Sequence, residues 1–596
     1  MANTSPFRLP RKSPLGLAEN VTEWATGLST LDRLYAQRPA GCDTESFLRF
    51  TLDVLEIDYH IVSGNSETIP KTGATVVVAN HPLGCVEGVI LAQVLLEIRK
   101  DVKILANEFL KLVPELEPLF IGVDVFNGAN AHQANSRAFR QANHHLERDG
   151  LLLVFPAGEV SQLVNKKSLQ LEDKQWSRSV SSLIKKNQAT TVPVHIGGVN
   201  SRPFYLAGKV HPILRTAMLG RELLNKKKSA IPISIGNNIK FSEVSSLDSQ
   251  QLVLYLRLNT YLLNHSHPNK NALSSSQQQI EQTIASETHL SELLEDIELL
   301  PEEHLLLTSG EFEVYCTTMD HIPAVMREIG RIREINFRRV GEGTGQPLDI
   351  DQFDQSYQHL FVWDKEKQKL VGAYRLGLVD QLIKQNDLRA LYSRTLFNFE
   401  QSFLDTMGRS IEMGRSVIAE EYQKSMGALL LLWKGIAEFI RRHPNYTHLF
   451  GPVSISNDYS DMARQLLTDT MTLHHYDNES ARHVSASNPP KQNHHKQWCP
   501  QSLSALADVQ LLSRVISRLD TGKGVPVLLR QYLNLNGKLV CFNVDANFND
   551  ALDGLIVVDL TTVPHKSLAR YMALMPLNTT SNVTTPYQSS MCYFRF

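Results

Sequence analysis

Residues 75–88, TVVVANHPLGCVEG, decide the fold of the first half of the chain. The first five of them, residues 75–79, are apolar and mostly β-branched, which is typical of a buried strand. Asn80, His81 and Pro82 follow as a turn, and the apolar spacing of residues 84–100 is helical. The stretch therefore predicts a strand, a turn and a helix in succession.

The same order of elements recurs further along the chain. Residues 151–155 (LLLVF) lead into PAGE at 156–159, and residues 191–196 (TVPVHI) lead into two glycines, with helical spacing between the two runs. Residues 15–65 also have helical spacing. Apolar strands separated by helices predict an α/β sheet with helices on its faces. In such sheets, the residues that do chemistry gather beyond the carboxyl ends of the strands.

Composition and charge limit the classes of function. The chain has 596 residues, enough for two to four domains of roughly 150 residues, and its 42% hydrophobic and 20% charged residues are ordinary for a globular protein. Its 60 basic and 62 acidic residues leave a net charge of −2, so no nucleic-acid partner is expected. Residues 1–270 nevertheless hold 30 basic against 24 acidic residues, which favours a membrane surface as a partner.

The cysteines and the apolar runs predict a location. The six cysteines lie far apart without a C-x-x-C pair, which is typical of a reducing compartment and argues against a zinc ribbon. No apolar run reaches the roughly 18 residues of a membrane span, and residues 1–14 lack the apolar core of a secretion signal. We therefore expect a protein of the cytosolic side that neither spans a membrane nor is secreted by that route.

A change of composition divides the chain. Residues 266–310 are rich in Asn, Ser and Gln and then acidic, which predicts a linker with one short amphipathic helix between domains at 1–265 and 311–596. The second domain is also predicted to be α/β, with an excursion at 478–500. Its expected strands are 360–364, 370–379, 411–418, 448–455, 537–544 and 554–560, and its expected helices are 426–442 and 525–535.

The turn after the first strand brings an imidazole near a carboxylate. His81 lies on the turn and Glu87 lies six residues later in the helix, so the two side chains can meet. A carboxylate bonded to one ring nitrogen fixes the tautomer and leaves the other nitrogen free to take a proton from a substrate hydroxyl. The alternative is a turn in which His81 only caps the helix and Glu87 faces solvent.

A second polar motif follows the strand at 151–155. FPAGEVS at 155–161 offers two oxygen-bearing side chains and a glycine, which can shape an acceptor site or orient an oxyanion donor; the alternative is an ordinary exit from a strand. Together with NHPLG at 80–84 and VPV at 192–194, this motif resembles those of the glycerolipid acyltransferase superfamily of the lysophosphatidate acyltransferases, over residues 60–245. The resemblance implies a catalytic dyad of His81 and Glu87 and an acceptor site lined by Asn80, Phe155, Pro156, Gly158, Glu159 and Ser161.

Two departures from the superfamily bear on the acceptor. The superfamily usually places an Asp after four intervening residues, whereas Glu87 follows after five, a longer gap that resembles the hemolysin-like branch. Phosphate-accepting members carry an Arg after Glu-Gly-Thr, and this Arg is missing here, while Ala157 replaces their first Glu. Because Arg is the natural bidentate ligand of phosphate, we expect an acceptor without phosphate.

The densest polar segment of the second domain is IEMGRSVI at 411–418. Glu412 and Arg415 on one strand, with a glycine between them, suit a site that deprotonates an amine and holds an anionic or carbonyl group. The alternative is a salt pair at a strand edge. Further polar residues form an ordered set with this segment, namely Arg333, Asp349, Asp351, Asp354, His359 and Arg375.

These segments, with LLRQY at 528–532, resemble the ornithine N-acyltransferase family, GNAT-like relatives of the acyl-homoserine-lactone synthases, over residues 312–575. The resemblance implies transfer of a 3-hydroxyacyl group from acyl carrier protein to the α-amine of an amino acid, with Glu412 and Arg415 as the catalytic residues. Ornithine presents a carboxylate and a spare ammonium, which Arg together with Asp or Glu can bind. The expected binding residues are Arg333, Asp351, Asp354, His359 and Arg375.

The whole chain thus resembles the bifunctional ornithine-lipid synthases. The resemblance implies that the second domain makes lyso-ornithine lipid and that the first domain esterifies its 3-hydroxyl from a second acyl carrier protein, peripherally at the cytoplasmic face of a bacterial inner membrane. Neither step requires a metal or redox cofactor. Three alternatives stay open: the same chemistry on glycine or another amino acid, a membrane-active hemolysin-like protein without catalysis, and a regulatory role for one degenerate domain.

Overall fold

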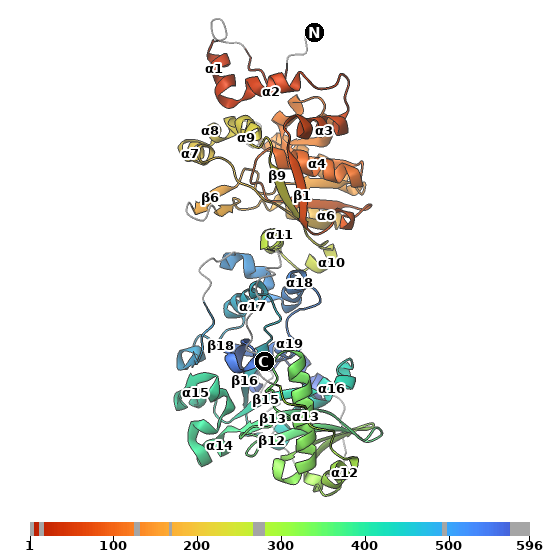
Figure 1. The fold of residues 1–596 in the computed structure, drawn as a ribbon, viewed down its shortest axis with the longest axis vertical. Helices are drawn as coiled ribbons and strands as arrows, with labels where there is room; N and C mark the ends of the chain where they lie inside the picture. The colour runs from red at the N-terminus through yellow and green to blue at the C-terminus, as the bar shows by residue number, and fades with distance from the viewer. Residues whose placement is uncertain are drawn as a thin grey trace, which may run out of the picture. The chain divides into compact units, whose positions relative to one another are not determined.

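The computed structural model describes residues 5–10, 17–123, 131–165, 170–265, 281–491 and 498–572. The chain forms two compact units, coloured in sequence order in Figure 1. Unit 1 consists of Met1–Leu273 with Asn493–Gly524, and unit 2 consists of Ser274–Gln492 with Val525–Phe596. Each unit combines helices with a central sheet, so the predicted α/β class is confirmed for both halves of the chain.

A seven-stranded sheet forms the centre of unit 1. Strand β2 (Thr75–Ala79) lies in the middle of the sheet and pairs in parallel with β5 and β8. All residues of β2 are buried, because helices cover both faces of the sheet. In spatial order the strands are β1 (Asp58–Ser63), β9 (Ala230–Ile235), β8 (Thr190–Ile196), β2, β5 (Leu151–Val154), β3 (Val102–Asn107) and β4 (Phe120–Val123), and β6 (Gln162–Asn165) pairs separately with β7 (Gln170–Glu172).

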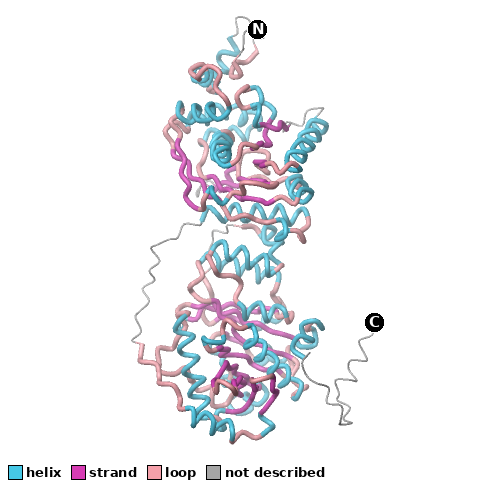
Figure 2. The backbone as a smooth tube through the Cα atoms, turned by 90° about the vertical axis from the view of Figure 1, so that its right-hand side faces the viewer, coloured by secondary structure: helices cyan, strands magenta, loops and turns pink. Residues whose placement is uncertain are grey.

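Helices lie on both sides of this sheet (Figure 2). Val77 and Ala79 of β2 share a core with Leu48 of α3 and Ile90 of α4. The alternate residues of β2 face a second layer, in which α11 contacts β2 and β8 while α5 contacts β5. The helices of unit 1 are α1 (Leu17–Thr26), α2 (Leu28–Tyr35), α3 (Thr44–Val54), α4 (Val86–Ile98), α5 (Ala131–Glu147), α6 (Ser179–Asn187), α7 (Arg202–Val210), α8 (Pro212–Ala217), α9 (Leu219–Asn225), α10 (Phe241–Val244), α11 (Ser249–Leu262) and α18 (Val509–Leu519).

Residues 493–524 lie in unit 1, although the chain on either side of them lies in unit 2. A 3-10 helix at Pro500–Ala507 packs against α11, and α18 follows it. The Arg518 guanidinium of α18 donates to both carboxylate oxygens of Glu243 at 2.6 and 2.7 Å. The amphipathic helix α18 buries one apolar face, made of Leu511, Leu512, Val515 and Ile516.

An eight-stranded sheet forms the centre of unit 2, and most of its neighbouring strands are antiparallel. In spatial order its strands are β10 (Leu305–Ser309), β11 (Phe312–Thr318), β12 (Gln358–Asp364), β13 (Lys369–Leu378), β15 (Ser410–Ile418), β16 (His448–Ile455), β19 (Ala551–Asp559) and β18 (Lys538–Asp545). A small second sheet pairs β14 (Phe397–Phe399) with β17 (Val484–Ala486).

Two long helices pack on opposite faces of the unit 2 sheet. Tyr374 of β13 meets Trp433 of α16, with ring centroids 6.3 Å apart. The next residue, Arg375, faces the other way and shares Asp354 with Arg333 of α13. The helices of unit 2 are α12 (Leu290–Glu298), α13 (Pro323–Arg339), α14 (Val379–Asn386), α15 (Gln401–Asp405), α16 (Met426–Arg442), α17 (Asp461–His474), α19 (Val527–Asn534) and α20 (His565–Met572).

Strands β15 and β16 run parallel and separate soon after they meet. They pair only from Ser410 opposite His448 to Glu412 opposite Phe450. Beyond this point β15 continues against β13 and bulges, and Arg415 lies in the bulge with φ 50°. A non-glycine residue with positive φ in a bulge is a recurrent feature of functional sites. Arg415 therefore lies on the part of β15 that no longer pairs with β16.

The prediction located the central elements and missed several at the edges. Strands β2 and β16 and helix α16 begin and end where the sequence predicts. Residues 58–63, expected to be helical, form the edge strand β1, because pairing with β9 overrides their local spacing. Residues 305–309 of the expected linker form β10 of the unit 2 sheet. None of the helices in the described ranges is both long and apolar enough to cross a bilayer.

Candidate active sites

His81 and Glu87 meet at the carboxyl end of β2, where α4 begins. The Nδ1 atom of His81 lies 2.9 Å from a carboxylate oxygen of Glu87. Glu87 is fully buried and accepts the backbone N–H groups of Leu83, Gly84 and Cys85 at 2.9, 2.7 and 3.0 Å. The turn that precedes α4 therefore satisfies the carboxylate, which lies beside the imidazole.

The electrostatics of the pair favour a charged carboxylate and a basic imidazole. Burial alone would lower the pKa of His81, but the charge and hydrogen bond of Glu87 outweigh burial and raise that pKa above its ordinary value. Burial would raise the pKa of Glu87, but the His81 charge and the N–H donors outweigh it and lower that pKa. The Nε2 atom of His81 has no hydrogen-bond partner among the described residues, and the side chain is 18% exposed. This nitrogen is available to a substrate hydroxyl.

A buried carboxylate, Asp173, helps to hold the backbone that carries the imidazole. The Phe155 ring packs against the His81 ring with centroids 4.6 Å apart. The Ser161 backbone N–H donates to the His81 carbonyl at 2.8 Å, and the Ser161 hydroxyl donates to Asp173 at 2.5 Å. Asp173 also accepts the Trp176 indole N–H at 2.8 Å and the His81 backbone N–H at 3.3 Å. Asp173 lies outside the recognised motifs, so sequence reasoning missed it.

Three other residues that were expected to line the acceptor site instead stabilise the backbone around the imidazole. Asn80 exchanges two hydrogen bonds with the backbone of Ile196, at 2.9 and 2.7 Å, and so links the ends of β2 and β8. Gly158 has φ 67° in the turn after β5, where a glycine is favoured. The Pro156 carbonyl of the same turn accepts the Ser177 N–H at 2.9 Å. These residues position the site, and their polar groups are already used within the protein.

Glu159 is held in ion pairs at the rim. One of its oxygens lies 2.8 Å from the Lys174 ammonium, and the other accepts from the Arg215 guanidinium. Arg215 is close enough to His81 to lower the pKa of the imidazole slightly against the larger effect of Glu87. An arginine does therefore lie near the imidazole, but Glu159 already neutralises it.

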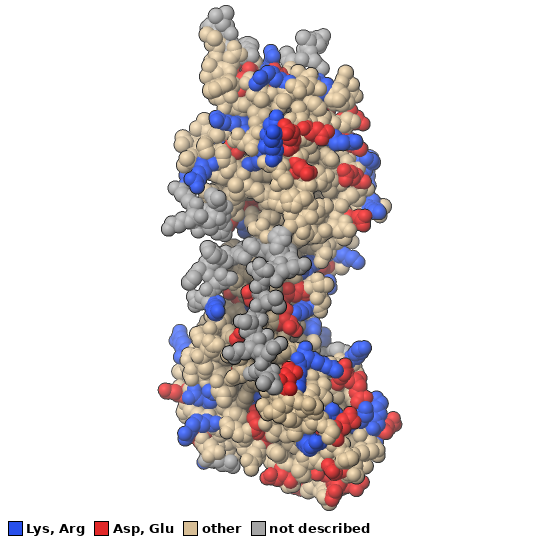
Figure 3. Space-filling view, in the orientation of Figure 1, with Lys and Arg blue, Asp and Glu red and all other residues tan. Residues whose placement is uncertain are grey.

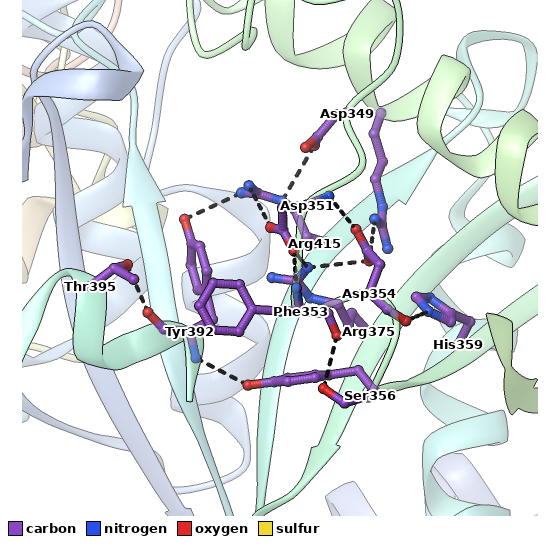
Figure 4. A network of polar contacts seen from close by, with 12 residues as sticks. Asp349, Asp351, Phe353, Asp354, Ser356, His359, Arg375, Tyr392, Thr395 and Arg415 are labelled. Carbon is purple, nitrogen blue, oxygen red and sulfur yellow. Dashed lines mark hydrogen bonds and ion pairs between the residues drawn. The ribbon is translucent and has the colours of Figure 1, made fainter. Parts of the chain in front are cut away.

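In unit 2, Arg415 is the centre of a charged network (Figure 4). Its guanidinium nitrogens lie 3.3 Å from an oxygen of Asp349 and 3.4 Å from an oxygen of Asp351. It donates to the Tyr392 hydroxyl at 3.3 Å, and its central carbon lies 4.9 and 5.1 Å from the ring centroids of Tyr392 and Phe548. These polar contacts are longer than the roughly 2.7–2.9 Å of a strong charge-assisted bond. The guanidinium therefore has capacity for a ligand carboxylate.

A second layer of charges lies beneath Arg415 and is fully buried. The Arg375 guanidinium contacts Asp351 at 2.6 Å and Asp354 at 3.2 Å, and Arg333 contacts Asp354 at 2.8 Å. Burial and the Arg333 charge lower the pKa of His359 to about 4, so its ring is neutral and bonds the Asp354 carbonyl at 2.8 Å. Burial opposes ionisation of Asp354, but the two guanidinium groups hold its pKa well below the ordinary value. This layer holds Asp351 against Arg415.

Glu412 makes no ion pair with Arg415 among the described residues. Its buried carboxylate accepts the Tyr357 hydroxyl and the backbone N–H groups of Tyr392 and Ser393, the latter two at 3.1 and 2.6 Å. The described ion pairs of Arg415 are with aspartates, so the alternative of a Glu412–Arg415 salt pair is wrong. Glu412 instead fixes the segment that carries Tyr392 beside the guanidinium, which is a positioning role.

Sequence reasoning missed a group of carboxylates near Arg415. Glu342 follows α13, Asp545 ends β18, and Asp553 lies within β19; all three act electrostatically on one another or on Arg415. Burial, together with the neighbouring acids, raises the pKa of Glu342 to about 7. Burial also raises the pKa of Asp553 to about 7, with Asp545 adding to the shift. A signal was present, because Asp553 is the single charge inside the apolar run 551–558.

Comparison with known proteins agrees with two acyltransferase sites. Residues 46–269 match a family model described as acyltransferase, and residues 332–434 match one described as acetyltransferase (GNAT) domain. Glycine N(alpha)-acyltransferases of Phocaeicola vulgatus and Bacteroides thetaiotaomicron are 29% and 30% identical over 268 residues, which is 42% of this chain and 80% and 78% of the relatives. A lyso-glycine lipid O-acyltransferase of Bacteroides thetaiotaomicron is 32% identical over 170 residues, 27% of this chain and 58% of the relative.

The sites and the comparisons lead to one conclusion about the protein. Unit 1 holds a histidine–carboxylate pair within the match to the acyltransferase model, and unit 2 holds the charged network around Arg415, part of which lies within the match to the GNAT model. The chain is an acyltransferase with two acyltransferase domains, and it belongs to the family of the glycine N(alpha)-acyltransferases.

Proposed function

We propose that unit 2 acylates the α-amine of an amino acid, ornithine, with a 3-hydroxyacyl group carried as a thioester by acyl carrier protein. The observation that carries the proposal is Arg415, a cation between two aromatic rings with only long contacts to aspartates. A guanidinium in this state suits the carboxylate of an amino acid. Glu342, Asp545 and Asp553 are more carboxylates than one α-ammonium needs, which supports an acceptor that carries a second ammonium, as ornithine does.

We propose that unit 1 then esterifies the 3-hydroxyl of the lyso-lipid from a second acyl carrier protein. His81 Nε2 takes the hydroxyl proton while the oxygen attacks the thioester carbonyl carbon. The carbon–sulfur bond then breaks, and the leaving thiolate takes the proton from the His81 imidazolium. Glu87 holds the ring through Nδ1 and stabilises the imidazolium that forms. The Glu159–Arg215 pair supports an acceptor without phosphate, because it occupies the guanidinium close to the imidazole.

Glycine is the second candidate acceptor, because relatives of this chain are named glycine N(alpha)-acyltransferase and lyso-glycine lipid O-acyltransferase. The test is competition. The purified chain receives equal amounts of isotopically labelled ornithine and glycine with one 3-hydroxyacyl carrier-protein thioester, and mass spectrometry measures the two N-acyl products. Excess N-acylornithine supports the first candidate, excess N-acylglycine replaces it with the second, and no product from either amino acid overturns the proposed reaction.

We propose that unit 1 works as a peripheral protein at the cytoplasmic face of the bacterial inner membrane. Its support is an exposed apolar face on α1, where Leu17, Val21 and Trp24 are 63%, 65% and 77% exposed at helical spacing. On the visible face of the described residues, acidic and basic side chains are interspersed, so the apolar face rather than a basic patch supports docking (Figure 3). Sedimentation with anionic vesicles should fall for Trp24→Ala with Val21→Ser; equal sedimentation would overturn the proposal.

A further inference from the structure

We propose that Asp553 takes the proton from the acceptor amine during N-acyl transfer, and that Glu342 and Asp545 help it to hold the ammonium opposite Arg415. The inference rests on the proposed N-acylation and assigns a catalytic residue to it. Glu412, the residue that the sequence suggested for this step, has both oxygens occupied inside the protein. The base must therefore come from elsewhere in the site.

The topology places Asp553 across from Arg415. β15 and β16 pair only as far as Glu412 and Phe450, and Arg415 lies on β15 beyond that point. On β16 the corresponding stretch continues to Ser454, which pairs with Asp553 of β19. Asp553 acts electrostatically on Arg415 and on the Tyr392 hydroxyl that Arg415 contacts. The two charged groups thus belong to one site, on either side of the separating strands.

Among the described residues, no cation pairs directly with the Asp553 carboxylate. One carboxylate oxygen accepts the Ser454 hydroxyl at 2.6 Å, and the other has no hydrogen-bond partner among the described residues. Asp553 is 2% exposed and has no ion pair in the described ranges, whereas the fully buried Asp354 contacts two arginines. Arg415 and Arg464 act on Asp553 only from beyond ion-pair distance, and a buried carboxylate without a directly paired cation is expensive to keep charged. A ligand ammonium supplies the missing cation.

The surrounding groups keep this carboxylate ready to exchange a proton near neutral pH. Those that face Asp553 or Glu342 are the carboxylates of Asp545 and Asp458, the guanidinium groups of Arg415 and Arg464, and the Tyr392 hydroxyl. Burial raises the pKa of Asp553 to about 7, and a general base is most effective when its pKa lies near the working pH. The Asp553 carboxylate can therefore accept a proton from an amine that binds as an ammonium.

The step balances without a further reagent. The ammonium gives one proton to the Asp553 carboxylate, and the freed amine nitrogen attacks the thioester carbonyl carbon. The carbon–nitrogen bond forms as the carbon–sulfur bond breaks, the thiolate takes the second amine proton, and Asp553 releases its proton to solvent. Arg415 meanwhile holds the carboxylate of the amino acid.

The test is the pH profile of N-acyl transfer by the full chain carrying Asp553→Asn. The change keeps an oxygen for the Ser454 hydroxyl and removes the charge. With ornithine or glycine and a 3-hydroxyacyl carrier-protein thioester, the unaltered chain should gain activity as pH rises through about 7. The variant should lose roughly 100-fold or more in kcat at pH 7.5. The remaining rate of the variant should rise tenfold per pH unit well above pH 7, because only the unprotonated amine then reacts and its fraction rises by that factor.

Two matched variants separate a chemical role from a structural one. Asp559→Asn makes the same change at the other end of β19, where the carboxylate lies 3.9 Å from His448, and should keep both rate and profile. Ser454→Ala removes a hydrogen bond that lowers the pKa of Asp553, so it should move the rising limb to higher pH. If the unaltered chain acylates neither amino acid, the proposed function fails. If it does, and Asp553→Asn keeps its rate and profile, the assignment of Asp553 alone is overturned.

Discussion

Changing Glu87 to Gln tests the histidine–carboxylate pair with the smallest change of shape. One oxygen of Glu87 accepts the Leu83 and Gly84 N–H groups and faces His81, and the other accepts the Cys85 N–H. A glutamine can keep the first set, but its NH2 group then opposes the Cys85 N–H. A buried unsatisfied donor costs about 1–3 kcal/mol, so with the lost charge we expect about 2–4 kcal/mol less unfolding free energy.

The kinetic effect of Glu87→Gln should be larger than its effect on stability. The tautomer of His81 is retained, but the charge that raises its pKa is gone, so burial then lowers the pKa of the imidazole. We expect O-acyl transfer to a 3-hydroxyacyl amino acid to fall about 100-fold, the low end of acid–base effects. The assay is thiol release from acyl carrier protein at several pH values, with N-acyl transfer measured on the same preparation.

The stability difference should depend on pH in a defined direction. The lowered pKa of Glu87 contributes stability above its ordinary value of 4.5, and the raised pKa of His81 contributes stability below its ordinary value of 6.5. The difference in unfolding free energy between the unaltered chain and Glu87→Gln should therefore be largest between pH 4.5 and pH 6.5, and it should become smaller at lower and at higher pH. Glu97→Gln, the same change at an exposed position of α4, is the control. An O-acyl transfer rate for Glu87→Gln within threefold of that control would refute the role of the pair.

Three further changes test other parts of the structure. Arg518→Ala removes the bidentate contact to Glu243 and should lower the urea midpoint of unit 1 by the equivalent of about 3–5 kcal/mol, whereas Arg514→Ala, a longer and exposed contact, should change it little. Glu412→Gln should release the segment of Tyr392 and raise the KM for the amino acid more than it lowers kcat in N-acyl transfer assays. Asp173→Asn should slow O-acyl transfer about tenfold or more while N-acyl transfer is unchanged, because it loosens the backbone of His81.

The sequence was sufficient for the elements that carry their own pattern. The apolar run of β2 and the turn at His81 gave the strand, the helix and the dyad, because strand, turn and first helical turn are local features. The amphipathic helix α18 is also local, but its pattern does not say which core it joins. Residues 493–524 were expected in the domain at 311–596, but they belong to unit 1. The apolar face of α18 is buried there, and Arg518 pairs with Glu243 of unit 1.

The site in unit 2 was harder to predict because its partners are distant in sequence. Arg415 was found from its segment, but the separation of β15 from β16 and the arrival of β19 depend on sheet order, which no local spacing reveals. The sequence predicts Glu412 as a catalytic residue because it does not reveal which groups bond the carboxylate of a strand residue. In the structure, the carboxylate oxygens of Glu412 accept hydrogen bonds from the Tyr357 hydroxyl and from backbone N–H groups. These N–H groups belong to a segment for which the sequence predicts no element.

The most direct measurement of the central proposal is the lipid content of a bacterial host that expresses single-site variants. His81→Ala should accumulate the N-acyl amino acid and no O-acylated product, because unit 2 still works. Arg415→Ala should yield neither lipid, because unit 1 then has no acceptor, and added N-(3-hydroxyacyl) amino acid should restore the O-acylated lipid. Identical lipid profiles for the two variants, or accumulation of the intermediate in Arg415→Ala, would contradict two separate and consecutive transfers.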